Sequence, residues 1–251
     1  MTALLEIDGL SKNFGGLRAV NGLSFTVRER EILGLIGPNG AGKSTVFNLI
    51  NGVFAPDQGR VTFTGADLTG KPPYRVARHG LARTHQIVQP LADLTVLENC
   101  TVGASFGREN LPLHRARAVA REVAVFVGLE DRLAVPAAQL TIAGKKRLEL
   151  ARALAARPLL LLLDEVLAGL NPTEIERMIE VLRAIRARGI SILIIEHVMR
   201  AIMSLSDRVV ALNLGRNLAE GSPQEVANHP AVIEAYLGDP KLMTMSEAAP
   251  S

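Results

Sequence analysis

The pattern of apolar and polar positions divides the chain into strand-forming and helix-forming stretches. Residues 4–10 and 23–27 alternate apolar with polar side chains, which predicts two strands of an antiparallel layer with one buried face. Residues 32–36, 158–163 and 190–195 are apolar almost throughout. Runs of this length are typical of central parallel strands that are covered on both faces. The chain is therefore predicted to be an α/β protein.

Helical periodicity dominates the middle of the chain. Between residues 90 and 157, apolar side chains recur at the spacing of amphipathic helices. This stretch, about 90–157, is predicted to be a helical insertion in a core formed by residues 1–89 and 158–238. We expect a single domain over residues 1–238. The small and polar residues of 239–251 predict a mobile C-terminal tail.

A glycine-rich turn lies between the first apolar run and a stretch with helical spacing. It comprises Gly37, Pro38, Asn39, Gly40, Ala41, Gly42, Lys43, Ser44 and Thr45. Because glycines tolerate positive φ, successive backbone N–H groups can form a nest for a β-phosphate, and the helix N-terminus adds partial positive charge. Lys43 is expected to bridge the β- and γ-phosphates, and Ser44 to bind Mg²⁺ through its hydroxyl. The flanking strand and helix favour this interpretation over an accidental match.

More polar groups are predicted to reach the same edge of the sheet. Asp164 and Glu165 follow the run at 158–163, and His197 follows the run at 190–195. In an open α/β sheet, the carboxyl ends of the strands face the ligand crevice. By itself, an acidic pair is a common loop start, and a lone histidine is more often a bystander. After a phosphate loop, we expect Asp164 to hold Mg²⁺, Glu165 to polarise the attacking water, and His197 to reach the γ-phosphate.

Composition narrows the function classes. The chain has 251 residues, a net charge of +3, 4% aromatic residues and no Trp, so no aromatic platform for single-stranded nucleic acid is expected. Cys100, the only cysteine, is expected to be a small apolar residue in the core or at its boundary, and a single cysteine favours a reducing compartment. The sequence has neither a signal-peptide pattern nor an apolar run of about 20 residues. We therefore expect any membrane link to go through a partner.

Basic residues gather in three clusters at helical spacing, which are predicted to be solvated helix faces. They are Arg115, Arg117 and Arg121; Lys145, Lys146 and Arg147; and Arg183, Arg186 and Arg188.

The order of Lys43, Asp164, Glu165 and His197 along the chain resembles that of the ATP-binding cassette (ABC) ATPases. The resemblance extends from residue 4 to about residue 238. It implies a P-loop NTPase core with a mixed sheet, an N-terminal antiparallel β layer and an inserted helical subdomain. The implied activity is ATP hydrolysis, with ATP and Mg²⁺ as cofactors.

The same resemblance implies roles for further residues. Gln86 stands where the family has the glutamine that senses the γ-phosphate at the metal site and couples to the membrane subunit. Phe14 stands where an aromatic ring stacks on adenine, although its position alone would suggest a core residue. Residues 168–171 occupy the place of the loop that contacts the opposite subunit.

Within that family, several segments resemble the ATPase subunits of branched-chain, or hydrophobic, amino-acid importers. They are residues 14–16, 83–86, 147–152, 168–172, 195–197 and 232–238. The implied partners are a second ABC ATPase subunit, two transmembrane permease subunits and, indirectly, a periplasmic or extracellular solute-binding protein. The implied location is the cytoplasmic face of the inner membrane, through the permeases. No nucleic-acid partner is expected.

One departure from the family pattern concerns its signature segment. Where the family has Leu-Ser-Gly-Gly-Gln, this chain has Leu140-Thr141-Ile142-Ala143-Gly144. Thr141 keeps a hydroxyl, and Ala143 still allows close backbone approach to a phosphate. Ile142 adds bulk, and Gly144 lacks the amide side chain. A helix that starts near Gly144 is expected to aim its N-terminus at the γ-phosphate of the partner's ATP, with a weakened contact.

The implied mechanism is a head-to-tail dimer that closes on ATP and opens after hydrolysis, driving the permeases between two orientations. Two alternatives stay open at this stage. One is a non-transport ABC ATPase that acts on nucleic acid or ribosomes, although such proteins typically carry coiled coils or two cassettes. The other is a catalytically weak regulatory nucleotide-binding subunit, which the altered signature would suit. The sequence predicts neither the solute nor whether the dimer is a homodimer or a heterodimer.

Overall fold

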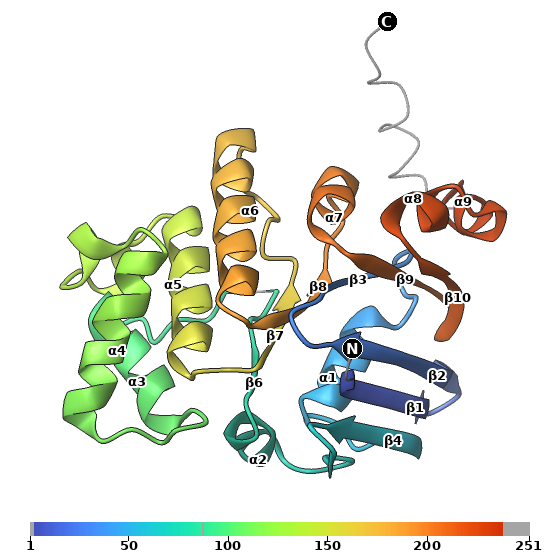
Figure 1. Cartoon of the computed structure of the whole chain (residues 1–251), viewed down its shortest axis with the longest axis horizontal. Helices are drawn as coiled ribbons and strands as arrows, with labels where there is room; N and C mark the ends of the chain where they lie inside the picture. Colours follow the sequence, from blue (N-terminus) through green and yellow to red (C-terminus); the bar gives the residue numbers. More distant parts are fainter. Residues whose placement is uncertain (1–2, 87, 238–251) are drawn as a thin grey trace, which may run out of the picture.

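The computed structural model describes residues 3–86 and 88–237, which form two sheets with helices around them (Figure 1). The strands are β1 (Ala3–Phe14), β2 (Leu17–Arg28), β3 (Ile32–Ile36), β4 (Gln58–Phe63), β5 (Ala66–Asp67), β6 (Leu81–Arg83), β7 (Leu160–Asp164), β8 (Ser191–Ile195), β9 (Arg208–Asn213) and β10 (Arg216–Gly221). The α-helices are α1 (Lys43–Ile50), α2 (Pro73–Arg78), α3 (Val96–Phe106), α4 (Leu113–Phe126), α5 (Ile142–Ala155), α6 (Pro172–Ala187), α7 (Met199–Leu205), α8 (Pro223–Ala227) and α9 (Pro230–Leu237). The tail predicted over residues 239–251 lies outside the described residues.

The two sheets differ in strand direction. The smaller sheet is antiparallel, with the order β2-β1-β4-β5. The larger sheet has the order β10-β9-β3-β8-β7-β6. Its strands are parallel except for the antiparallel edge strand β10. This arrangement confirms the predicted α/β class, with a mixed sheet and an N-terminal antiparallel layer.

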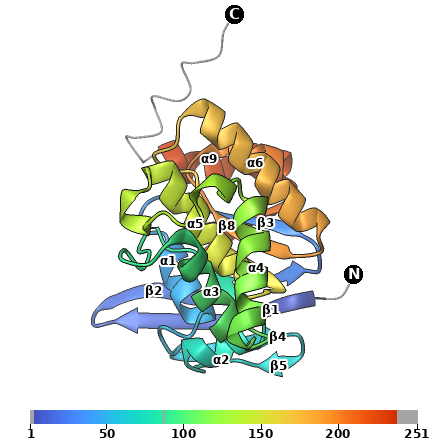
Figure 2. The same cartoon turned by 90° about the vertical axis from the view of Figure 1, so that its left-hand side faces the viewer.

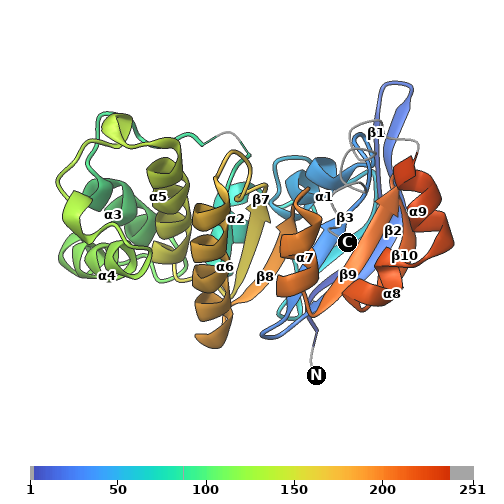
Figure 3. The same cartoon turned by 90° about the horizontal axis from the view of Figure 1, so that it is seen from above.

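The central strands are apolar throughout because each separates two cores. In β7, Leu161 and Leu163 belong to the core that also contains residues of α3 to α7, whereas Leu160 and Leu162 belong to the core beneath α1 and the antiparallel sheet. Figure 1 shows α6 and α7 on one face of the large sheet and α1 on the other, and Figure 3 looks down on the face that carries α6 and α7. Because neither face of these strands is exposed to water, polar side chains occur only at the strand ends.

Helices α3, α4 and α5 lie side by side beyond the β6 end of the large sheet, at the left of Figure 1 and nearest the viewer in Figure 2. Cys100 is fully buried among them, as predicted, and burial raises the pKa of its thiol to about 12. The boundary of a separate helical subdomain at about 90–157 stays a prediction. No helix within the described part of the chain has the length and apolar character of a membrane span.

Candidate active site

The turn between β3 and α1 has a backbone that only glycine adopts without strain. Gly37, Gly40 and Gly42 have φ values of 153°, 78° and 100°. A Cβ at Gly37 would lie 2.3 Å from the carbonyl oxygen of Leu212, and one at Gly42 would lie 2.4 Å from that of Ala19. Positive φ and close backbone approach both exclude a side chain at these positions. The fold around the turn thus requires the glycine pattern.

Lys43 is the first residue of α1, and its side chain lies over the turn. The residue is 7% exposed, and its Nζ donates to the carbonyl oxygens of Gly37 at 2.7 Å and Pro38 at 3.0 Å. These contacts hold an ammonium group beside the nest of N–H groups. A phosphate chain in the turn would therefore meet a positive charge at the start of a helix.

A pocket of about 380 Å³ opens above this turn and gathers side chains from three strand ends. Gln86 comes from the segment after β6, Glu165 from the end of β7 and His197 from the end of β8. The lining residues are Leu17, Arg18, Ala19, Asn39, Gly40, Ala41, Gly42, Lys43, Ser44, Thr45, Gln86, Glu165, His197 and Leu214. Glu165 and His197 thus meet as their positions at the ends of neighbouring strands predicted, and Gln86, which was predicted from the family resemblance alone, joins them.

Glu165 is the centre of the polar group in this pocket. Its Oε1 lies 2.8 Å from Nε2 of His197, and its Oε2 accepts a hydrogen bond of 2.8 Å from Nε2 of Gln86. Glu165 has a φ of 49°, in the left-handed region that costs a non-glycine residue about 1–2 kcal/mol. Such strain persists only where surrounding contacts fix the residue, as they do here. The carboxylate is thereby held in a defined direction inside the pocket.

Asp164 is positioned by Arg83, a residue for which no role of its own was predicted. Asp164 is 2% exposed, and its Oδ2 accepts a 2.9 Å hydrogen bond from Nη2 of Arg83. Nη1 of Arg83 donates to Oδ1 of Asn48 on α1 at 2.6 Å. The other carboxylate oxygen of Asp164, Oδ1, is buried without a hydrogen-bond partner among the described residues. A buried oxygen of this kind fits a hydrated cation.

The site suits a magnesium ion that binds together with a phosphate. Ser44 is exposed and lines the pocket near the start of α1. Within residues 3–86 and 88–237, no group of three or more His, Cys, Asp or Glu is arranged to hold a metal ion by itself. Mg²⁺ commonly uses one or two protein ligands and completes its shell with substrate phosphates and water. Ser44, Gln86 and Asp164 offer the oxygen ligands that suit this ion, and their joint binding of it stays a prediction.

The structure corrects the prediction that Lys145, Lys146 and Arg147 form a solvated face. Lys146 is 6% exposed, and its Nζ donates to the carbonyl oxygen of Glu165 at 2.8 Å. Lys146 therefore belongs to the surroundings of the site. The spacing of the basic residues could not predict this contact, because only the folded chain brings the carbonyl group of Glu165 next to the helix.

Glu196, one residue before His197, is a second residue that sequence reasoning missed. It is 3% exposed, and its Oε1 accepts a 2.7 Å hydrogen bond from the backbone N–H of Leu167. Burial raises the pKa of this carboxyl from 4.5 to about 7, against the opposing effect of that hydrogen bond and of Lys146. Its position at the end of a buried apolar strand could have indicated that the carboxyl group is buried.

Glu196 should make stability depend on pH. Between about pH 4.5 and 7 the folded chain keeps a proton that the unfolded chain has lost, so this group lowers the free energy of unfolding as the pH rises, by up to about 3 kcal/mol. Glu196→Gln should remove this dependence while keeping the acceptor for Leu167. Urea unfolding at pH 5 and pH 8 measures it, with the exposed Glu176→Gln as the control. An equal pH effect in wild type and Glu196→Gln would contradict the assignment.

The remaining predicted site residues lie outside this pocket. Phe14 is 41% exposed, which contradicts the simple core interpretation, and its ring meets that of Phe54 edge-on at 5.2 Å. Thr141, Ala143 and Gly144 stand at the beginning of α5 and do not line the pocket. The structure does not bring them to the phosphate loop of the same chain. Stacking on adenine and contact with a partner's nucleotide therefore stay predictions.

Helix α5 begins at Ile142, two residues before the predicted start near Gly144. Thr141 is its N-cap, and the Thr141 hydroxyl oxygen accepts a hydrogen bond of 3.2 Å from the N–H of Gly144. The cap explains the earlier start, because it satisfies an N–H group of the first turn. Ile142 is 66% exposed, so its bulk points away from the core.

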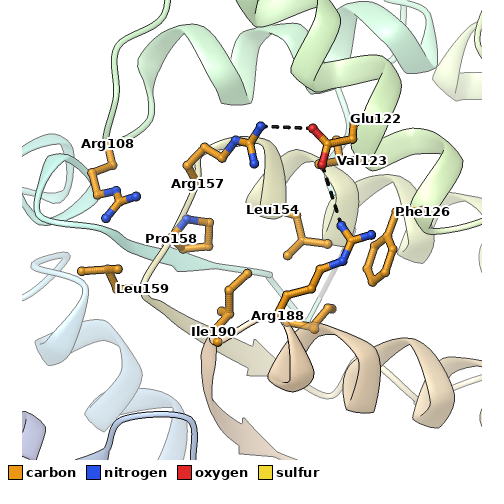
Figure 4. Close-up of a pocket in the computed structure, with 12 residues that line it drawn as sticks. Arg108, Glu122, Val123, Phe126, Leu154, Arg157, Pro158, Leu159, Arg188 and Ile190 are labelled. Carbon is orange, nitrogen blue, oxygen red and sulfur yellow. Dashed lines mark hydrogen bonds and ion pairs between the residues drawn. The ribbon is translucent and has the colours of Figure 1, made fainter.

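A second pocket, of about 250 Å³, lies between α4, α5 and α6 (Figure 4). Two of its three arginines, Arg157 and Arg188, are already paired with Glu122. Nη2 of Arg157 lies 3.1 Å from Oε2 of Glu122, and Nη1 of Arg188 lies 3.8 Å from Oε1 of the same residue. Leu159 and Ile190, which line this pocket, precede β7 and β8. It therefore lies at the strand ends opposite to Glu165, and we assign it no part in nucleotide binding.

Comparison with known proteins agrees with this geometry. Residues 20–168 match the family described as ABC transporter, and residues 216–241 match the family described as branched-chain amino acid ATP-binding cassette transporter. The chain is 41% identical over 250 residues to the high-affinity branched-chain amino acid transport ATP-binding protein LivG of Salmonella typhimurium. The alignment covers 94% of this chain and 98% of that protein. Identity to the corresponding protein BraF of Pseudomonas aeruginosa is 38%, with the same coverage. Among solved structures, a nucleotide-free ATP-binding cassette from an ABC transporter is similar, with a TM-score of 0.86 at 30% identity, over 95% of this chain and 100% of that one.

Proposed function

Because the chain belongs to the ABC transporter family, we propose that it is the ATP-hydrolysing subunit of an importer for branched-chain or other hydrophobic amino acids. The observation that carries the proposal is the meeting of the Lys43 turn with Glu165 and His197 in one pocket. The solute class is supported by the match of residues 216–241 and by the names of the relatives. These matches favour an importer over an ABC ATPase that acts on nucleic acid or ribosomes.

The turn at residues 37–45 would bind the triphosphate, with its N–H groups and Lys43 opposite the β- and γ-phosphates. Mg²⁺, held by Ser44, Gln86 and Asp164, would neutralise the charge that develops on the phosphate oxygens. Arg83 keeps Asp164 in place by the hydrogen bond between Nη2 and Oδ2. Phe14 would stack on the adenine ring.

Glu165 is the group in this pocket that is best placed to act as a base. Its carboxylate would take a proton from a water molecule as the water oxygen bonds to the γ-phosphorus. The bond from the γ-phosphorus to the bridging oxygen then breaks, and ADP keeps that oxygen. His197 and Gln86 orient the carboxylate through the hydrogen bonds at Oε1 and Oε2. His197 would also contact the γ-phosphate.

A second ATPase subunit would complete the site. The first turn of α5, capped by Thr141, would face the γ-phosphate of the other subunit's ATP, with Ala143 and Gly144 allowing close approach. ATP would then contribute affinity for the closed dimer, and hydrolysis would remove it. The closing and opening of the dimer would be passed to two permease subunits through the Gln86 segment and α3 to α5. The permeases would also attach the protein to the cytoplasmic face of the membrane. A solute-binding protein would act indirectly, from the other side.

Transport in vesicles tests the proposal. The membrane subunits that co-purify with the chain are reconstituted with it and with the solute-binding protein, and uptake of labelled leucine is followed with and without MgATP. We expect ATP-dependent uptake that unlabelled isoleucine and valine compete for and that charged amino acids do not. Glu165→Gln should abolish it. Uptake without ATP, or ATP hydrolysis that leucine and its analogues never stimulate, would contradict the proposed function.

A further inference from the structure

Helix α5 carries two buried charged side chains on its inner face. Lys146 is 6% exposed and Glu149 is 4% exposed. They are three residues apart, so they lie on the same side of the helix. Burial lowers the pKa of Lys146 and raises the pKa of Glu149. Charged groups are costly to bury and are retained where they make specific hydrogen bonds.

Both side chains bind backbone groups in the two segments that carry the pocket's polar residues. Nζ of Lys146 donates to the carbonyl oxygen of Glu165 at 2.8 Å, and Oε1 of Glu149 accepts from the N–H of His85 at 2.8 Å. His85 immediately precedes Gln86, whose Nε2 donates to Oε2 of Glu165 at 2.8 Å. The helix, the Gln86 segment and Glu165 thus form a closed ring of contacts.

The hydrogen bond from Lys146 reaches the carbonyl group of a residue whose backbone is strained. Glu165 has a φ of 49°. Its carbonyl oxygen also accepts from the N–H of Ala168 at 3.2 Å, in the turn that follows β7. A hydrogen bond from an ammonium group is stronger than this neutral one. Lys146 is therefore well placed to hold the peptide group that sets the direction of the Glu165 side chain.

We propose that Lys146 and Glu149 are positioning residues for ATP hydrolysis, and that through them α5 holds Glu165 and Gln86 in the geometry that the reaction needs. This inference rests on the proposed function. The same helix begins with Thr141 to Gly144, the segment predicted to face the partner's nucleotide. Helix α5 would then link two sites: its first turn would contact the ATP bound by the partner subunit, and its inner face would hold Glu165, the base that acts on this subunit's own ATP.

Substitution of each residue tests the proposal, with the full chain purified together with the membrane subunits that bind it. Lys146→Met should lower kcat by about tenfold or more, since small displacements of a catalytic group cost rates of this order. The Kd for MgATP should stay within about twofold, because neither residue lines the pocket. Lys146→Arg keeps a donor and should restore most of the rate. Glu149→Met should behave like Lys146→Met, whereas Glu149→Gln keeps the acceptor and should be active.

The matched control is Arg147→Met, which removes a charge from the same helix at a partly exposed residue with no hydrogen bond or ion pair among the described residues. It should keep the wild-type rate. A double variant separates positioning from a general loss of structure. If Lys146 acts through Glu165, Lys146→Met should lower the residual rate of Glu165→Gln by less than about twofold.

The outcomes are distinct. An unchanged kcat in Lys146→Met, a loss that Lys146→Arg does not restore, or a full tenfold loss on top of Glu165→Gln would each overturn the inference. Wild-type protein that does not hydrolyse MgATP would instead overturn the proposed function.

Discussion

Glu165→Gln is expected to lower the rate of ATP hydrolysis by at least about 100-fold, the usual contribution of a general base. Glutamine has nearly the same shape and can still bond to His197 or Gln86, but it cannot take a proton from water. Binding of MgATP should therefore persist. Phosphate release at saturating MgATP measures the rate, and a nucleotide titration measures the binding.

This substitution should also trap the nucleotide-bound dimer, because hydrolysis would no longer remove the ATP that joins the subunits. Size-exclusion chromatography with MgATP should show more dimer for Glu165→Gln than for wild type. Glu176→Gln, an exposed change on α6, is the matched control and should leave both readouts unchanged. Normal hydrolysis by the Glu165→Gln chain would refute the assignment of the base.

Lys43→Ala is expected to weaken nucleotide binding by about 10- to 100-fold, or about 1.4–2.8 kcal/mol, the range for loss of a charge-assisted hydrogen bond. The side chain lies over the turn, with Nζ 2.7 Å from the carbonyl oxygen of Gly37. A triphosphate in the turn would receive this ammonium group, and alanine offers no replacement. Calorimetric titration with MgATP gives the Kd directly.

The control for this substitution is Lys71→Ala, in the loop before α2 and outside the pocket lining. Its Kd should match that of wild type. Since Lys43 also bonds to the turn itself, thermal unfolding of each variant shows whether the turn has been disrupted. Lys43→Ala that folds normally and binds MgATP as tightly as wild type would exclude the phosphate role.

Much of the site could be predicted because its parts obey local or strand-end rules. The turn needs glycine because its backbone has positive φ, and this requirement is local. The glycine spacing in the sequence is therefore enough to predict the turn. Glu165 and His197 meet because β7 and β8 are adjacent parallel strands that end at the same edge. Such rules need no knowledge of how helices pack.

The parts that could not be predicted depend on tertiary contacts. Lys146 sits between two partly exposed basic residues, and its partner is a backbone carbonyl 19 residues away, which leaves no pattern in side-chain chemistry. Glu149 likewise binds a backbone N–H. The early start of α5 had a local signal in Thr141, but Gly144 stands where a capping box would have Glu or Gln. The predicted start therefore fell two residues late.

The most direct test of the central claim is an experimental structure of the Glu165→Gln chain with MgATP. We expect the triphosphate in the turn at residues 37–45, the γ-phosphate between Lys43 and His197, and Mg²⁺ beside Ser44 and Oδ1 of Asp164. Thr141 to Gly144 of a second ATPase subunit should lie on the far side of that phosphate. A nucleotide bound elsewhere, or a γ-phosphate that points away from residues 165 and 197, would contradict the account.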